Sequence, residues 1–196
     1  MKTLNTITLA LLACAASASS VAQYNGYDAS SSWTTGGKGY VLPTINAMDP
    51  DGKFGNAGNG TGIGLRVGKA VSPTLDIQAG MTFSRAQNGI ARYRQNTLGV
   101  DGLYLFSRDR LRPFVLVGLG GEFDKLRTAA GQASDTSAYI NAGLGFQYSF
   151  TPQWGMQLDF RRAHAFITGN DFAFRRANTN VLTVGLTYAL DGWPAR

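Results

Sequence analysis

The feature that most constrains the fold of this chain is a strict alternation of residue types over positions 138–150. Every second residue from Ala138 to Phe150 is apolar or aromatic, and the residues between are glycine, serine, amides and Tyr139. A period of two is the pattern of a β-strand with one apolar face. A tilted strand needs about ten residues to cross a bilayer. Lipid on one side and a narrow polar lumen on the other would produce this contrast, so we predict a membrane-spanning strand.

The same alternation recurs along the chain. It is found in six further segments: 62–68, 75–84, 97–106, 115–120, 154–161 and 181–190. We predict a first strand over 39–48, although Pro43 interrupts it and suits only an edge or a bulge.

The connections between these eight segments alternate in length. Three are short (72–74, 107–112 and 151–153), and four are long and polar (49–61, 85–96, 122–137 and 162–178). This alternation is typical of outer-membrane barrels, with the long loops outside the cell. The sequence therefore predicts an all-β fold, an eight-stranded antiparallel up-and-down transmembrane β-barrel.

Aromatic residues fall into two groups along the predicted strands. One group lies beside the short turns: Tyr104, Phe106, Phe114, Tyr148, Phe150, Trp154 and Tyr188. The other lies toward the long connections: Phe83, Phe123, Tyr139 and Phe160. Aromatic belts on either side of an aliphatic band are favoured at the two bilayer interfaces. The soluble alternative, a secreted β-sandwich, would scatter aromatic residues through its core.

The first residues have the pattern of a secretory signal peptide. Lys2 gives a positive start, an apolar stretch follows, and small residues precede a cleavage site between Ala22 and Gln23. The expected organisation is a cleaved signal over 1–22, a lead-in segment over 23–38, a barrel over 39–190 and a tail over 191–196.

The single cysteine and the charge of the chain carry less information. Cys14 lies inside the signal, where we interpret it as a small apolar residue; a lipoprotein anchor is the alternative. The mature chain would then have no disulfide. Only 15% of residues are charged, which is low, and the net charge is +6. No recognised nucleic-acid motif accompanies that charge, so no nucleic-acid partner is expected.

Several segments resemble OmpA-type outer-membrane barrels when taken in order. They are residues 39–51, 96–108, 112–121 and 157–161. The last predicted strand also resembles the signal that the barrel-assembly machinery reads in such proteins, through Thr183, Gly185, Tyr188 and Leu190. The resemblance covers residues 39 to 190 and implies this machinery as a partner. The sequence ends at Arg196 without the peptidoglycan-binding domain of many members, so cell-wall tethering is not expected.

Inward-facing charges form the first candidate site. The interior of an eight-stranded barrel is about filled by its own side chains. Arg66, Asp101 and Asp159 are predicted to face inward at similar depth, with Arg161 slightly higher and Asp76 lower. Because buried charges must pair, we predict a lumenal polar network of these five residues. A plugged, self-neutralising core is favoured over an ion gate or small pore.

Basic residues in the predicted outer loops form the second candidate site. They are Arg85, Arg92, Arg94, Lys125, Arg127, Arg162, His164, Arg175 and Arg176. Arginine binds phosphate through two parallel hydrogen bonds, so contact with lipopolysaccharide or another anionic polymer is one interpretation. The alternative is a solvated loop surface. The acidic turn at Asp49–Gly52 lacks the further ligands of a calcium loop, so no metal and no cofactor are expected.

An enzymatic role is not expected. Small barrels that remove acyl chains from lipid A need a His-x-Ser pair with an acidic partner. The only histidine reads His164-Ala165-Phe166, no serine follows it, and the sole glutamate, Glu122, begins a predicted outer loop. We expect a monomeric bacterial outer-membrane protein with a structural, envelope-stabilising and surface-interacting role. A narrow channel is the alternative; carriage of a hydrophobic ligand and lipid A modification are less favoured.

Overall fold

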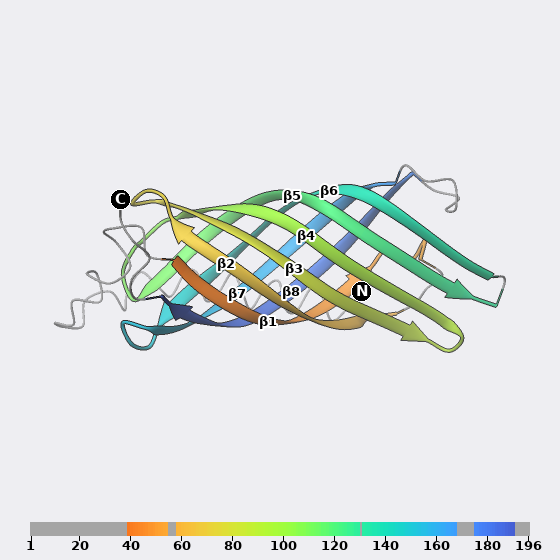
Figure 1. Cartoon of the computed structure of the whole chain (residues 1–196), viewed down its shortest axis with the longest axis horizontal. Helices are drawn as coiled ribbons and strands as arrows, with labels where there is room; N and C mark the ends of the chain where they lie inside the picture. The colour runs from red at the N-terminus through yellow and green to blue at the C-terminus, as the bar shows by residue number, and fades with distance from the viewer. Residues whose placement is uncertain (1–38, 55–57, 130, 168–174, 191–196) are drawn as a thin grey trace.

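The computed structural model describes residues 39–54, 58–129, 131–167 and 175–190. They form eight strands: β1 (Gly39–Pro50), β2 (Gly60–Ala70), β3 (Leu75–Asn88), β4 (Ala91–Leu105), β5 (Leu111–Thr128), β6 (Gly131–Ser149), β7 (Trp154–Phe166) and β8 (Arg176–Ala189). Each strand pairs antiparallel with the next, and β8 pairs with β1 (Figure 1). The predicted fold class is confirmed. The predicted signal, its cleavage site at Ala22 and Gln23, the lead-in and the tail lie outside the described residues.

The two faces of the barrel wall have opposite polarity. Ile45, Ile63 and Val117 face outward with about two-thirds of their surface exposed (65, 65 and 67%). The lumen holds fully buried polar groups such as Arg112 and Gln157. Large apolar side chains in such numbers on an outer wall need an apolar surrounding, which a bilayer provides. The described residues contain no helix with the length and hydropathy needed to span a membrane.

Pro43 lies inside the closed sheet, so its expected position at an edge or bulge is wrong. It faces Leu65 on β2 in the ordinary register. On its other side, the pairing with β8 stops at Val41 and resumes at Thr44, with no change of register. Proline lacks the N–H that the ladder needs, so only the local pairing is lost and the strand continues.

Two of the four long outer connections are not loops. β3 and β4 are joined by a two-residue turn at Gly89–Ile90, and β5 continues to Thr128 before β6 begins at Gly131. Gly89 has a φ of 59°, which glycine adopts without strain. The predicted loops at 85–96 and 122–137 are therefore wrong. These residues extend the paired strands into long hairpins, which form one end of the molecule (Figure 1).

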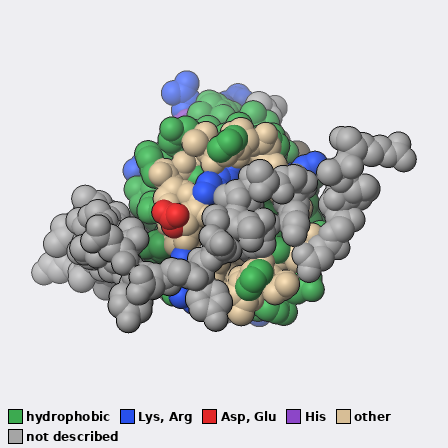
Figure 2. All heavy atoms as spheres, turned by 90° about the vertical axis from the view of Figure 1, so that its left-hand side faces the viewer, with side chains coloured by type: hydrophobic (Ala, Val, Ile, Leu, Met, Phe, Trp, Pro, Cys, Tyr) green, Lys and Arg blue, Asp and Glu red, His purple; other side chains and the backbone are tan. Residues whose placement is uncertain are grey.

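The aromatic belts are only partly as predicted. Tyr104, Phe106 and Trp154 face outward near the short turns, and Tyr104 packs edge-on against Phe106 with ring centroids 5.5 Å apart. Phe114 and Tyr139, however, point into the lumen, where they are 2% and 8% exposed. Alternation along the strand decides which face of the wall a side chain is on, and it places both residues inward. Their position near a bilayer interface does not change that face. Figure 2 shows the end with the short turns, where hydrophobic side chains lie around the wall.

Candidate functional site: the polar lumen and the basic outer rim

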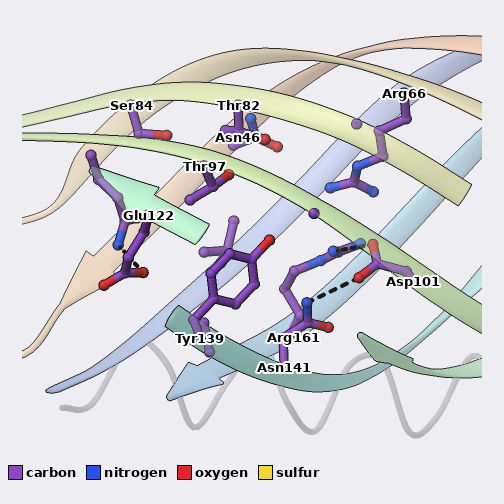
Figure 3. Close-up of a pocket in the computed structure, with 15 residues that line it drawn as sticks. Asn46, Arg66, Thr82, Ser84, Thr97, Asp101, Glu122, Tyr139, Asn141 and Arg161 are labelled. Atoms are coloured by element: carbon purple, nitrogen blue, oxygen red, sulfur yellow. Dashed lines mark hydrogen bonds and ion pairs between the residues drawn. The ribbon is translucent and has the colours of Figure 1, made fainter. Parts of the chain in front are cut away.

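Four of the predicted network residues meet in the middle of the lumen. Arg161 on β7 places Nη1 2.7 Å from Asp101 Oδ2 and Nε 2.8 Å from Asp159 Oδ1. Arg66 on β2 places Nη1 2.9 Å from the other oxygen of Asp159 and donates to Thr183 Oγ1 at 3.3 Å. Figure 3 shows Arg161 turned toward Asp101 across the lumen. Two arginines and two aspartates thus pair as a charge-neutral cluster.

The polar network continues toward the short turns through amide and hydroxyl groups. Gln157 donates to Asp159 at 3.0 Å and accepts from Gln78 at 2.8 Å. Gln78 also donates to the hydroxyl of Tyr40 at 2.8 Å, and Tyr40 donates to Asp76 at 3.3 Å.

Asp76 lies at the end of this chain, apart from the four central charges with which it was grouped. Its ion pair is with Arg108, whose Nη1 lies 2.8 Å from Asp76 Oδ1. Arg108 comes from the short connection after β4 and was missed by the sequence analysis. Residues of a turn carry no inside–outside alternation, so no periodic signal marked it.

An acidic cluster fills the lumen toward the outer hairpins. Glu122 and Asp124 point inward from β5 and are almost fully buried. Gln95 donates to Glu122 at 3.2 Å, and Tyr93 donates to Asp124 at 2.8 Å. The expectation that Glu122 begins an outer loop is wrong. Glu122 and Asp124 continue the alternation of the inward-facing Gly118 and Gly120. This alternation could have predicted from the sequence that both carboxyl groups face the lumen.

Lumenal glycines make room for these large side chains. A Cβ built on Gly118 would collide with Asp101 Oδ1, and one built on Gly99 would collide with the Tyr139 hydroxyl. On Gly143 it would meet the Cα of Arg161 at 2.9 Å. The missing side chains of these inward-facing glycines therefore leave the space in which the charged and aromatic side chains of the lumen pack.

Little space remains inside the barrel. The cavity among the network residues, which include Arg66, Asp101, Glu122 and Arg161, has a volume of about 50 Å³. A cavity needs about 10–15 Å³ on this measure to hold one water molecule, so this cavity fits a few waters.

The residues considered for metal and nucleophile chemistry lie in the described part of the chain. It contains no group of three or more His, Cys, Asp or Glu side chains able to hold a metal ion. Asp51, from the rejected calcium turn, accepts a hydrogen bond from the Lys53 backbone at 3.2 Å. The Nδ1 of His164 lies 2.9 Å from Asn178 Oδ1.

The predicted anion-contacting residues are exposed but do not form one group. Arg85 lies opposite Arg94, and Arg92 lies two pairs nearer the hairpin tip. Arg162 lies on β7 opposite Asn180, while Arg175 and Arg176 are at the start of β8. Arg85, Arg92 and Arg94 have no hydrogen bond or ion pair to any described residue. Arg85 and Arg94 form the basic outer rim, and Arg92 lies beyond it, toward the tip of the β3–β4 hairpin.

The predicted assembly signal lies on the strand that closes the barrel. Thr183 faces the lumen, Gly185 lies opposite Thr44 on β1, and Tyr188 packs against Trp154 with ring centroids 4.8 Å apart. Leu190 follows the strand, and its N–H donates to the Gly39 carbonyl at 2.9 Å. Recognition of this four-residue signal by the barrel-assembly machinery stays a prediction.

The closed eight-stranded wall, apolar outside and polar inside, is that of a transmembrane β-barrel. The sequence matches the outer membrane protein beta-barrel domain over residues 6–189, and the chain belongs to this family. No curated protein matches the chain in sequence.

Solved structures share the fold. Neisserial surface protein A is 14% identical, with 78% of this chain and 97% of that chain covered and a TM-score of 0.61. Ail, the attachment invasion locus protein of Yersinia pestis, solved in complex with the heparin analogue sucrose octasulfate, is 11% identical over 80% and 100% of the chains, with a TM-score of 0.55. A major outer membrane protein of Thermus thermophilus is 13% identical over 77% and 99%, with a TM-score of 0.54. Membership of this family supports an outer-membrane location.

Proposed function

We propose that this protein is a non-conducting structural barrel that stabilises the bacterial outer membrane. The observation that carries the proposal is the filled lumen, in which Arg66 and Arg161 neutralise Asp101 and Asp159 and leave a cavity of only about 50 Å³. Buried ions held by several partners are costly to separate. An open pore would require these pairs to break, so a plug fits the geometry better than a gate.

The outer hairpins suit a surface-interacting role. They extend beyond the apolar band as paired strands and carry the basic outer rim above that band. Arginine side chains at this level can bind the phosphates of lipopolysaccharide. We further propose that the chain is exported by its signal segment, inserted by the barrel-assembly machinery as a monomer, and has no catalytic role.

Conductance in planar bilayers tests the proposal. The mature chain is refolded into micelles, and its electrophoretic mobility is compared with and without boiling, since a closed barrel that resists detergent shifts on heating. The folded protein should then give no single-channel currents. An Arg161→Ala/Asp101→Ala variant, which removes one cross-lumen pair, serves as the positive control for an opened lumen. Steady currents from the wild type would favour the narrow channel instead.

A further inference from the structure

A hollow on the outer wall lies directly below the basic outer rim. It has a volume of about 700 Å³. Apolar side chains of four neighbouring strands line it, among them Ile45 on β1, Ile63 on β2, Phe83 on β3 and Leu182 on β8. Arg85 and Arg94 stand on its border. We call this feature the outer hollow.

The strand register explains why the wall is hollowed here. Leu182 lies opposite Ala47, Ala47 opposite Thr61, and Thr61 opposite Arg85, so these residues form one row across β8, β1, β2 and β3. The next row toward the short turns holds the larger side chains Val184, Ile45, Ile63 and Phe83. Ala47 and Thr61 are the small members, and the hollow opens over them.

The same row continues into three adjacent cations. Arg85 lies opposite Arg94, and Arg94 lies opposite Lys125 on β5. All three are exposed on the outer face, and no described carboxylate pairs with any of them. Neighbouring strands are about 4.8 Å apart, and like charges directly opposite each other are destabilising. An anion bound to this basic row would remove that repulsion.

The position of the outer hollow restricts the chemistry of its occupant. Its floor belongs to the apolar band that faces lipid, whereas its basic border lies on the side of the outer hairpins. A soluble anion would leave the floor exposed, and a neutral lipid would leave the cations unpaired. An amphiphile with an acyl chain and a phosphate fits both parts. The volume is within the usual range of small-molecule sites, about 300–1,000 Å³.

We propose that the outer hollow binds one phosphorylated glycolipid of the outer leaflet, lipid A, as a defined site. This inference rests on the proposed outer-membrane role and names its lipid partner. One acyl chain lies over Ala47 and Thr61, and a phosphate receives hydrogen bonds from Arg85 and Arg94. Arginine's planar fork suits bidentate binding of phosphate, and Lys125 adds a further positive charge.

The test measures retention of lipid A on the full mature chain in nanodiscs. The discs contain phosphatidylcholine with a small fraction of bis-phosphorylated lipid A, and bound lipid is counted by native mass spectrometry. The wild type should retain one lipid A per barrel. The Arg85→Gln/Arg94→Gln variant should retain at least about tenfold less, because each lost hydrogen bond to a charged phosphate weakens binding by about tenfold or more. Thr61→Leu, which fills the hollow without changing charge, should also reduce retention.

The matched control removes the same charge one row further out. Arg92 and Arg127 lie opposite each other on β4 and β5, away from the outer hollow. The Arg92→Gln/Arg127→Gln variant should retain lipid A within about twofold of the wild type. Equal losses in both double variants, or no retention by the wild type, would overturn a defined site. So would equal retention of phosphatidylglycerol, which carries a single phosphate diester.

Two further readouts separate this inference from the proposed function. Every variant is first checked for the shift in electrophoretic mobility on heating, so that a misfolded barrel is not scored as a loss of binding. Conductance is then measured on the same samples. A silent, heat-modifiable barrel that retains no lipid A would overturn the lipid site and leave the structural role standing.

Discussion

Arg161 on β7 reaches across the lumen to Asp101 on β4, with Nη1 2.7 Å from Oδ2. These strands are not neighbours, so the pair joins opposite parts of the wall. We expect Asp101→Ala to lower the free energy of unfolding by about 3–5 kcal/mol. Without Asp101, the buried charges of Arg66 and Arg161 would have only the carboxylate of Asp159 to pair with. Urea unfolding in phospholipid vesicles measures this change. Asp109→Ala, in an exposed turn, is the control; equal stability of the two variants would exclude a structural role for the network.

Gly118 provides the second prediction, since its missing side chain leaves the space that Asp101 occupies. Gly118→Ala should displace the Asp101 carboxylate and destabilise the barrel by roughly 1–3 kcal/mol, as overpacking does. Gly102→Ala is a matched control on β4, because the nearest atom to its added Cβ is 3.9 Å away. Vesicle unfolding of both variants gives the comparison. A Gly118→Ala barrel as stable as Gly102→Ala would contradict the close contact.

Glu122 and Asp124 give a prediction of opposite sign. Both carboxyl groups are buried on the same face of β5, and neither has an ion pair with a described basic residue. We expect Glu122→Gln to raise the free energy of unfolding by about 1 kcal/mol, because the amide avoids the cost of burying or neutralising a carboxylate beside Asp124 while keeping the shape and the hydrogen bond from Gln95. Thermal unfolding in micelles checks the sign, with Asp109→Asn as control. A destabilised Glu122→Gln variant would contradict the expected sign and show that the Glu122 carboxyl group stabilises the barrel.

The position of the bilayer can be tested with two arginine substitutions on the outer face. Val117 on β5 lies in the middle of the apolar band and is 67% exposed. Thr136 on β6 is also exposed but lies opposite Phe123, near the upper limit of the band. Val117→Arg should cost about 2–4 kcal/mol and Thr136→Arg about 0–1 kcal/mol. Folding efficiency into vesicles would rank them, and similar costs would mean that the band is placed wrongly.

The sequence predicted the part of the barrel that lies in lipid. There, outward residues such as Val115, Val117 and Leu119 are apolar and most inward ones are small or polar, so the period of two defines strand, face and depth. Near the short turns this contrast weakens, since Phe114 and Leu116 are apolar and face the lumen. Arg66, Asp101, Asp159 and Arg161 were placed together because their distances from the short turns are similar. The ion pairs join the same four residues.

The regions that sequence reasoning missed lie where that contrast disappears. Above the apolar band the outer face meets water, so Lys125 and Arg127 alternate with Asp124 and Leu126 and no apolar face is visible. The backbone still pairs fully, and residues read as loop are strand. Arg108 was missed for a different reason, because it reaches the lumen from a turn. Its partner Asp76 was predicted in the network at a lower level, and hydrogen bonds through Tyr40, Gln78 and Gln157 join it to Asp159.

The tight turn at Gly89–Ile90 has a practical consequence. Both residues are exposed at the tip of a rigid, fully paired stem, and a side chain added at Gly89 would meet nothing within 4 Å. Loop tips of this kind tolerate inserted sequence, because the insertion disturbs no buried contact. With the proposed orientation, in which this hairpin faces outward from the cell, we expect the turn to accept a foreign peptide for display on the bacterial surface, held clear of the membrane by the hairpin beneath it.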